Sequence, residues 1–392
     1  MRFLLTLGFC ALAAPTLWAD EFTNATRPLL KKYCISCHGP DRQKGDIVLH
    51  DLDNLDAAFK KHALLDNIID QIESGDMPPD DEDLLPTDAE RKQLIGAISK
   101  VSERIKSGNV PQKAGRVTLR RLNRNEYHYT VRDLFGVNFN PSQDFPADGA
   151  GGEGFDNTAA ALFSSPALLE KYLAAAKKVI ASVYADPQLK SKAIFAQPKT
   201  EKEADATAEK VLGFHASLAY RRRVTQEDMA PLMTAFKRGM QGGNSFDDSL
   251  RAPLTALLIN PRFLFRAEHN EAGKDEWKLN DFEIATRLSY FLWSSMPDRE
   301  LFRLADAGKL SDPAVLQAQT LRMIASPKST ALARHFAGQW IGFDKMISVV
   351  DPDKKRFPTF DSDLRRAMYY EGVEFFSHLL QKNRPITELI DS

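Results

Sequence analysis

Two cysteines and a histidine stand together in the segment "KKYCISCHGP", residues 31–40. Cys34 and Cys37 are separated by two residues, and His38 follows directly. This Cys-x-x-Cys-His pattern is the one through which c-type haem is attached to a chain. The two thiols would form thioethers with the haem vinyl groups, and the adjacent imidazole would reach the iron as the proximal ligand. The pattern therefore predicts one haem c per chain, held by Cys34, Cys37 and His38.

Other uses of this pair compete with haem attachment. In an oxidising compartment two cysteines commonly form a disulfide. Half of a zinc site would need two further ligands, and neither a second Cys pair nor a His-x3-His cluster follows in the sequence. A thioredoxin-like dithiol would need a preceding strand, whereas "TNATRPLLKKY" (23–33) has the pattern of a short amphipathic helix. These comparisons favour haem.

A second axial ligand must come from further along the chain, and the candidates are His50, His62 and Met77. Met77 lies in "ESGDMPPDDE", where Pro78 and Pro79 favour an irregular loop over a helix core. Such a loop could present the thioether sulfur to the iron, so Met77 is the expected distal ligand, with His62 and an open or water-ligated site as the alternatives. Methionine ligation raises the reduction potential of a haem, as suits an electron carrier.

The surrounding elements complete a small domain. Thr87 and Glu90 form the sequence signature of a capping box. Apolar residues recur at helical spacing from Leu94 to Ile105. With the helix before the cysteines and the methionine loop, this closing helix predicts a cytochrome c-like haem domain over residues 21–107. The segment "SGNVPQKAG" (107–115) is then a linker.

The first residues predict export. Arg2 precedes an apolar run from Phe3 to Ala14, and Ala19 is a small residue before Asp20. This is the pattern of a signal peptide over residues 1–19, so we expect a periplasmic or extracellular protein. No later stretch is long and apolar enough for a membrane span in the mature chain.

The composition limits the partners. The formal net charge is -1 over 392 residues, so no overall field attracts the chain to nucleic acid. We therefore expect no nucleic-acid partner. The redox partner protein is not identified by the sequence.

Residues from 116 onward predict helices almost throughout. Strong helical patterns include "LLEKYLAAAKKVIASVY" (168–184) and "TQEDMAPLMTAFKRGM" (225–240), and a break is expected at Asn260-Pro261. The predicted fold class is mainly α: the small haem domain is followed by an all-α region of one or two domains. Its helical segments are expected over 116–184, 205–268 and 277–392.

This second part shows no catalytic motif. Its histidines are scattered, and His335 in "ARHFAGQW" has the surroundings of a core histidine. The stretch "GFDN" is a candidate ligand contact to which the sequence assigns no chemistry. Enzymatic activity therefore stays uncertain, and an electron-transfer protein is favoured over a self-contained enzyme.

Several blocks resemble one known architecture. "CISCHGP", "KGDIVL" and "SGDMPP" resemble the planctomycete-type cytochrome c domain, whose cysteines, proximal histidine and Met-Pro-Pro loop fall on Cys34, Cys37, His38 and Met77. "RLNRNEYHYTVRDLFGV", "AYRRRVTQEDM" and "LSYFLWSSMPDREL" resemble the uncharacterised helical domains that follow it, DUF1587, DUF1595 and DUF1592. The resemblance implies haem binding and electron transfer. Such proteins continue beyond "PITELIDS" into further domains, which implies a C-terminally truncated member.

These observations favour an exported monohaem cytochrome whose helical domains dock a partner or substrate. One alternative is a periplasmic oxidoreductase with its own active site in the helical part. Another is a non-enzymatic scaffold in which haem stabilises the small domain. The acidic run "DMPPDDEDLL" could steer a basic redox partner, although such runs are more often solvated loops.

Overall fold

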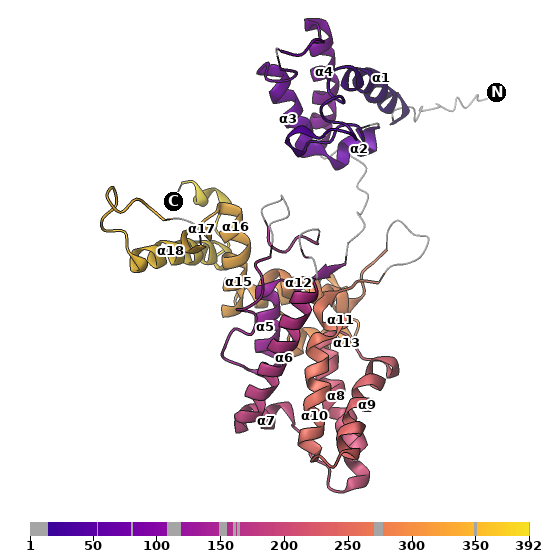
Figure 1. Cartoon of the computed structure of the whole chain (residues 1–392), viewed down its shortest axis with the longest axis vertical. Coiled ribbons are helices and arrows are strands. Elements are labelled where there is room, and N and C mark those ends of the chain that lie inside the picture. The colour runs from indigo at the N-terminus through magenta and orange to yellow at the C-terminus, as the bar shows by residue number, and fades with distance from the viewer. Residues whose placement is uncertain are drawn as a thin grey trace, which may run out of the picture. The chain divides into compact units, whose positions relative to one another are not determined.

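A computed structural model describes residues 15–52, 54–79, 81–107, 119–148, 155–159, 162, 165–269, 277–348 and 351–391. The chain divides into two compact units, residues 1–114 and 115–392 (Figure 1). Helices dominate the described residues, and the strands among them are two residues long. The predicted mainly α fold class is therefore confirmed. Among the described helices, none has both the length and the apolar character needed to cross a bilayer.

The first unit is a small helical domain with its own core. Its elements are α1 (Pro15–Tyr33), a 3-10 turn (Lys44–Asp46), α2 (Leu55–Lys60), α3 (His62–Glu73) and α4 (Asp88–Lys106). Helix α4 packs against both α1 and α3, and the fully buried side chains of Leu30, Leu65 and Ile98 lie in the core between them. Helix α1 is longer than the predicted helix over 23–33. Residues 1–14 of the predicted signal peptide lie outside the described residues.

Glu90, in the first turn of α4, both caps this helix and connects it to α1. Thr87 accepts a hydrogen bond from the backbone N–H of Glu90, and the Glu90 carboxylate accepts one from the backbone N–H of Thr87, which confirms the capping box. The same carboxylate accepts hydrogen bonds from Lys32 at 3.0 Å and from the Tyr33 hydroxyl at 2.9 Å. Helix α1 is thereby tied to α4 immediately before Cys34.

The first described element of the second unit is β1 (Arg120–Arg121), and β2 (Phe265–Arg266) is the other strand among its described residues. Its helices are α5 (Arg124–Phe135), α6 (Pro166–Ala185), α7 (Pro187–Ala193), α8 (Ala204–Tyr220), α9 (Gln226–Gln241), α10 (Phe246–Ile259), α11 (Pro261–Leu264), α12 (Asp281–Trp293), α13 (Arg299–Asp306), α14 (Pro313–Ile324), α15 (Thr330–Leu332), α16 (Gly338–Ile341), α17 (Lys345–Ser348) and α18 (Ser362–Gln381). Short 3-10 turns lie at Glu201–Glu203, Pro327–Ser329 and Ile386–Leu389. The expected helix break at Asn260-Pro261 is confirmed by the boundary between α10 and α11.

Helices α6, α8, α9 and α10 lie side by side and enclose the larger core of this unit (Figure 1). The tightest approach is between α9 and α10. A Cβ atom at Gly239 would lie 2.9 Å from Cα of Ser249. Glycine is therefore the residue that lets the two backbones come this close.

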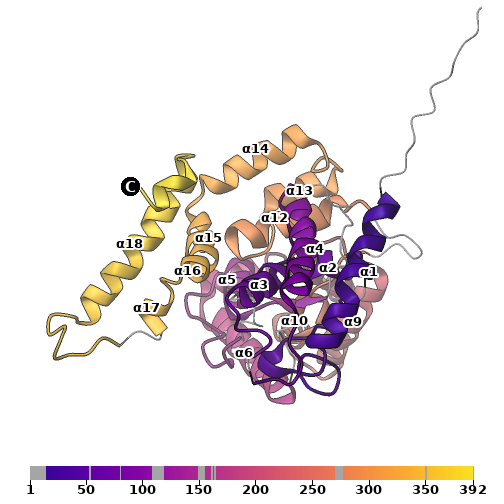
Figure 2. The ribbon, with the colours of Figure 1, turned by 90° about the horizontal axis from the view of Figure 1, so that it is seen from above.

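A second core belongs to the C-terminal helices. It contains buried residues of α12, α13, α15 and α18, such as Trp293, Leu301 and Val373. Helices α15, α16 and α18 lie beside one another in both views (Figures 1 and 2). Between α15 and α16 the chain forms a π-helical turn at Ala333–Ala337.

The two short strands pair antiparallel although they lie far apart in the sequence. Arg120 lies directly opposite Arg266, and Arg121 lies opposite Phe265. The pairing joins the start of the second unit to the end of α11.

Candidate functional site

The Cys34–His38 segment continues the end of α1 as a tight turn. The backbone N–H of Cys34 donates to the Leu30 carbonyl at 2.9 Å, and the N–H of His38 donates to the Cys34 carbonyl at 2.9 Å. The spacing Cys-x-x-Cys-His therefore occupies about one helical turn. Both thiols and the imidazole are carried by a backbone whose geometry is fixed by these hydrogen bonds.

The chain reverses directly after the histidine. A Cβ at Gly39 would lie 2.3 Å from the Ile35 carbonyl oxygen, so a side chain at this position would force the backbone apart. The His38 carbonyl accepts a hydrogen bond from the N–H of Leu49 at 2.9 Å. The tight turn at Gly39 and the hydrogen bond from Leu49 therefore fix the backbone position of His38.

A cavity of about 360 Å³ lies next to this turn, and Cys34, Cys37, His38 and Met77 all line it. The four residues predicted from the sequence are thus brought to one place. Of the alternative axial ligands, His50 is exposed and is not among the lining residues. His62 begins α3, but its side chain lies outside the described residues.

Met77 is presented by the loop that follows α3. The chain turns at Gly75, whose φ of +82° is left-handed. The N–H of Met77 then donates to the Gln71 carbonyl at 3.0 Å. With 38% of its surface exposed, Met77 is not a core residue, and its role as the distal ligand stays a prediction.

The cavity walls are largely apolar. Leu64, Ile68 and Ile72 come from α3, Leu49 from the loop before α2, and Leu94 from α4. The α3 residues recur every four positions and therefore share one helix face. That spacing is visible in the sequence, but an apolar helix face by itself does not indicate a role at the site.

Both cysteines are free thiols. Burial, and secondarily the nearby Cys37, raises the pKa of Cys34 to about 11. The Cys37 thiol lies 3.9 Å from a carboxylate oxygen of Glu82. Reactive dithiols instead depend on a lowered pKa and an electropositive environment, so these cysteines lack the features of a thioredoxin-like pair.

The competing zinc site also lacks support. Within the described part of the chain, no group of three or more His, Cys, Asp or Glu residues is arranged to hold a metal ion. The element before the cysteines is helix α1, as the sequence predicted, rather than the strand that a dithiol fold requires.

The donor set fits a haem. The Nδ1 atom of His38 is buried and makes no hydrogen bond with the described protein, so the imidazole is not committed to a structural contact. Two free thiols, this imidazole and a thioether face an apolar cavity. Soft sulfur and imidazole ligands beside a hydrophobic space are what a covalently attached iron porphyrin needs.

Family models match four segments of the chain in a fixed order. The planctomycete cytochrome C model matches residues 34–81. Three models described as proteins of unknown function follow: DUF1587 over 120–185, DUF1595 over 207–268 and DUF1592 over 279–392. This order is the architecture that the sequence resemblance predicted, and the first match indicates a cytochrome-type protein.

No curated protein matches the chain significantly. No solved structure matches it significantly either.

Proposed function

We propose that this chain, in which a planctomycete cytochrome C segment precedes DUF1587, DUF1595 and DUF1592, is an exported monohaem c-type cytochrome that transfers single electrons. One observation carries the proposal: Cys34, Cys37, His38 and Met77 line the same cavity although Met77 lies about 40 residues after the motif. A disulfide, a dithiol or a zinc site gives no reason for the methionine to be there.

Each residue then has a separate task. The Cys34 and Cys37 sulfurs would anchor the haem covalently, and the His38 imidazole and the Met77 sulfur would be the ligands of its iron. When bound, the haem supplies a reversible one-electron change at its iron. The apolar walls around Leu64 and Ile68 would exclude water and so reduce the reorganisation that accompanies a change of charge.

A redox partner would receive the electron at the solvent-exposed rim of the cavity, next to Met77. Asp76, Asp81, Glu82 and Asp83 are exposed next to Met77, and Glu82 and Leu84 belong to the cavity rim. Exposed negative charge there supports approach of a basic redox partner by electrostatic attraction. The second unit would dock this partner or a substrate.

Export belongs to the same proposal. Residues 1–19 have the signal-peptide pattern, and the periplasm or the extracellular space would be the site of action. Cleavage would leave Asp20 as the first residue, which intact-mass measurement can test together with the mass of one attached haem.

The decisive experiment compares absorption spectra of the protein matured with a c-type haem attachment system, oxidised and then reduced. We expect sharp c-type bands on reduction, and in the oxidised protein the weak long-wavelength band of a thioether ligand. Met77→Ala should abolish that weak band and lower the reduction potential while the haem stays attached. His50→Ala and His62→Ala are the matched controls, and their spectra should equal that of the wild type.

Two results would contradict the proposal. If the mass of the matured protein contains no haem, Cys34 and Cys37 must form a disulfide or remain thiols. If haem is attached but the oxidised wild type lacks the band, and His50→Ala or His62→Ala changes the spectrum whereas Met77→Ala does not, the distal ligand is a histidine.

A further inference from the structure

A larger cavity of about 670 Å³ lies within the second unit, far along the sequence from the cysteine motif. Its walls include Arg120, Asp156, Arg266, Tyr290 and Phe336. These residues come from all three segments that match the families of unknown function. The volume is in the range of pockets that hold small molecules, so the three segments together build one site.

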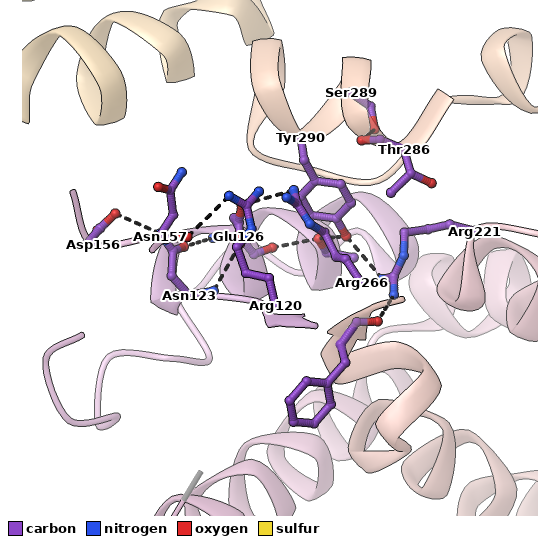
Figure 3. Close-up of polar contacts among 12 residues, drawn as sticks. Arg120, Asn123, Glu126, Asp156, Asn157, Arg221, Arg266, Thr286, Ser289 and Tyr290 are labelled. Atoms are coloured by element: carbon purple, nitrogen blue, oxygen red, sulfur yellow. Dashed lines mark hydrogen bonds and ion pairs between the residues drawn. The ribbon is translucent and has the colours of Figure 1, made fainter. Parts of the chain in front are cut away.

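Two arginines are held side by side at the wall of this cavity. The β1–β2 register places Arg120 opposite Arg266, and like charges directly opposite each other destabilise a sheet. The buried carboxylate of Glu126 lies between them, 3.7 Å from Arg120 and 3.4 Å from Arg266 (Figure 3). One further guanidinium N–H of Arg120, at Nε, is buried and has no partner in the described protein.

The charges at the cavity wall are arranged in two groups. Arg287 and Glu268 line the cavity and pair with each other at 2.6 Å. Arg120 and Arg266 share the carboxylate of Glu126, and the ring of Tyr290 lies 4.7 Å from the guanidinium of Arg266. The remaining carboxylate of the lining, Asp156, accepts a hydrogen bond from the Asn123 side chain at 2.9 Å (Figure 3).

The protonation of Glu126 decides the net charge beside Arg120 and Arg266. Burial, aided by the Asp156 carboxylate, raises the pKa of Glu126 to about 7, whereas Arg120 and Arg221 oppose the change. Near neutral pH the carboxyl is thus partly uncharged and neutralises the arginines only in part. A bound anion would complete the neutralisation.

Part of the cavity lining is aromatic. Phe155 and Phe336 stack with their ring centres 5.8 Å apart and an angle of 2° between the planes. Trp340 continues the stack at 5.6 Å from Phe336. Phe291 also lines the cavity and has 60% of its surface exposed. Exposed aromatic rings beside converging polar groups are typical of small-molecule sites.

The backbone of this wall has two unusual conformations. His335 and Phe336 lie in the π-helical turn Ala333–Ala337, and such turns occur frequently at functional sites. Ser294, another lining residue, has a φ of +51°, a left-handed conformation that costs energy for a residue other than glycine. Both irregularities place side chains at the cavity.

His335 itself has a structural task. Its Nδ1 atom lies 3.2 Å from the Asn125 amide nitrogen, and its Nε2 atom lies 3.1 Å from the Tyr129 hydroxyl. Burial, with Arg334 and His128, lowers the pKa of His335 to about 4. The ring is therefore neutral and fixed, as expected of a core histidine, and it does not compete for an anion.

We propose that this cavity binds an organic carboxylate carried on a flat, apolar ring. The carboxylate would lie against Arg120 and Arg266, where charge-assisted hydrogen bonds are strong, and the ring would pack against Phe336 and Phe291. The residues of this site do not bind the proposed haem, so the ligand proposal can be tested independently of the electron-transfer proposal.

Isothermal titration calorimetry on the full haem-loaded chain tests the ligand class, with sodium benzoate as the probe. Benzamide has the same shape without the charge, and benzylamine carries the opposite charge. We expect benzoate to bind at least ten times more tightly than benzamide, and benzylamine not to bind. If benzoate fails to bind, or if benzamide or benzylamine binds as tightly, the proposal is overturned.

Substitutions test the residues. Arg120→Gln should weaken benzoate binding at least tenfold, whereas Arg238→Gln, at an exposed position of α9, should leave it unchanged. Unchanged affinity in a folded Arg120→Gln protein, as judged by circular dichroism, would refute the assigned position of the carboxylate. If Arg120→Gln does not fold, the comparison of the three probes on the wild type still decides the ligand class.

Glu126→Gln provides an independent readout. Glutamine can still accept the hydrogen bond from the Asn123 backbone N–H, which Glu126 accepts at 3.1 Å, but it no longer competes for the arginines. We expect tighter benzoate binding in this variant. In the wild type, titrations near neutral pH in buffers of different ionisation enthalpy should show proton uptake on binding, because the ligand's charge favours protonated Glu126. Weaker benzoate binding in Glu126→Gln, or equal proton uptake in the two proteins, would contradict the claim that Glu126 competes with the ligand for Arg120 and Arg266.

Discussion

A single carboxylate, that of Glu90, joins the two helices that hold the cysteine turn. It accepts hydrogen bonds from Thr87 at the start of α4 and from Lys32 and Tyr33 at the end of α1. These bonds lower the pKa of Glu90 from 4.5 to about 2, with those from Thr87 contributing most. The Glu90 side chain is partly exposed, with 25% of its surface accessible, so solvent screening keeps its contribution to stability modest.

The sign of the resulting pH dependence follows from the lowered pKa. The folded state binds the proton of Glu90 less tightly than the unfolded state, so its contribution is present above pH 4.5 and is lost as the pH falls toward 2. We expect hydrogen exchange in α1 and α4 to accelerate over this window more steeply in the wild type than in Glu90→Gln. Glu103→Gln, at an exposed position of the same helix, should follow the wild type. Identical profiles for wild type and Glu90→Gln would rule out this role.

Local sequence was sufficient for the first site and insufficient for the second cavity. Cys34, Cys37 and His38 are neighbours, and the prolines after Met77 marked its loop, so these residues could be named from the sequence alone; their roles as haem ligands stay predictions. Arg120 and Arg266 are far apart in sequence and meet only through tertiary pairing. No local pattern indicates such a pair, although "GFDN" was a candidate contact region by sequence, and Phe155 and Asp156 line the cavity.

At the scale of elements, the contact between α9 and α10 depends on one residue without a side chain. A methyl group at Gly239 would meet Cα, Cβ and Oγ of Ser249, each at 2.9 Å. Because Cα belongs to the backbone, the clash cannot be relieved by rotating a side chain, and the two helices would have to separate.

Gly239→Ala should therefore destabilise the second unit by about 1–3 kcal/mol, the usual cost of overpacking. Gly213→Ala is the matched control on α8, because there a Cβ would meet only Met229 at 3.9 Å. That variant should be neutral or more stable by up to about 1 kcal/mol, since alanine favours the helix. Urea unfolding of both variants measures the difference. Equal stabilities would show that the helices adjust without cost.

The helices themselves were readable from the sequence for physical reasons. Apolar spacing and N-terminal caps such as Thr87 and Thr225 act within a few residues, and both caps are present in the structure. The π-helical turn at Ala333–Ala337 could not be anticipated. The turn packs against α18, a tertiary contact that the local sequence does not indicate.

At the scale of the whole molecule, the first and the second unit have separate hydrophobic cores. We expect two calorimetric unfolding transitions. In the haem-free double variant Cys34→Ser/Cys37→Ser, the transition of the first unit should move to a lower temperature, because an apolar cavity of about 360 Å³ is left without its occupant. The second transition should be unchanged. A single transition, or an equal shift of both, would contradict this independence.

The pairing of β1 with β2 has one more consequence. It brings residues 120 and 266 together, so the chain enters and leaves this stretch at the same point, and most of the larger core lies inside it. Such a stretch has adjacent ends, which is the property that lets a segment be excised, transplanted or circularly permuted. Cut out on its own, it would keep most of its core but lose the core residue Tyr290 and the aromatic rings of Phe291 and Phe336, which lie outside it. Folding of the stretch and binding of the ligand would then be separable. The β1–β2 pair joins the two ends of the stretch, but half of the residues that line the cavity lie outside it.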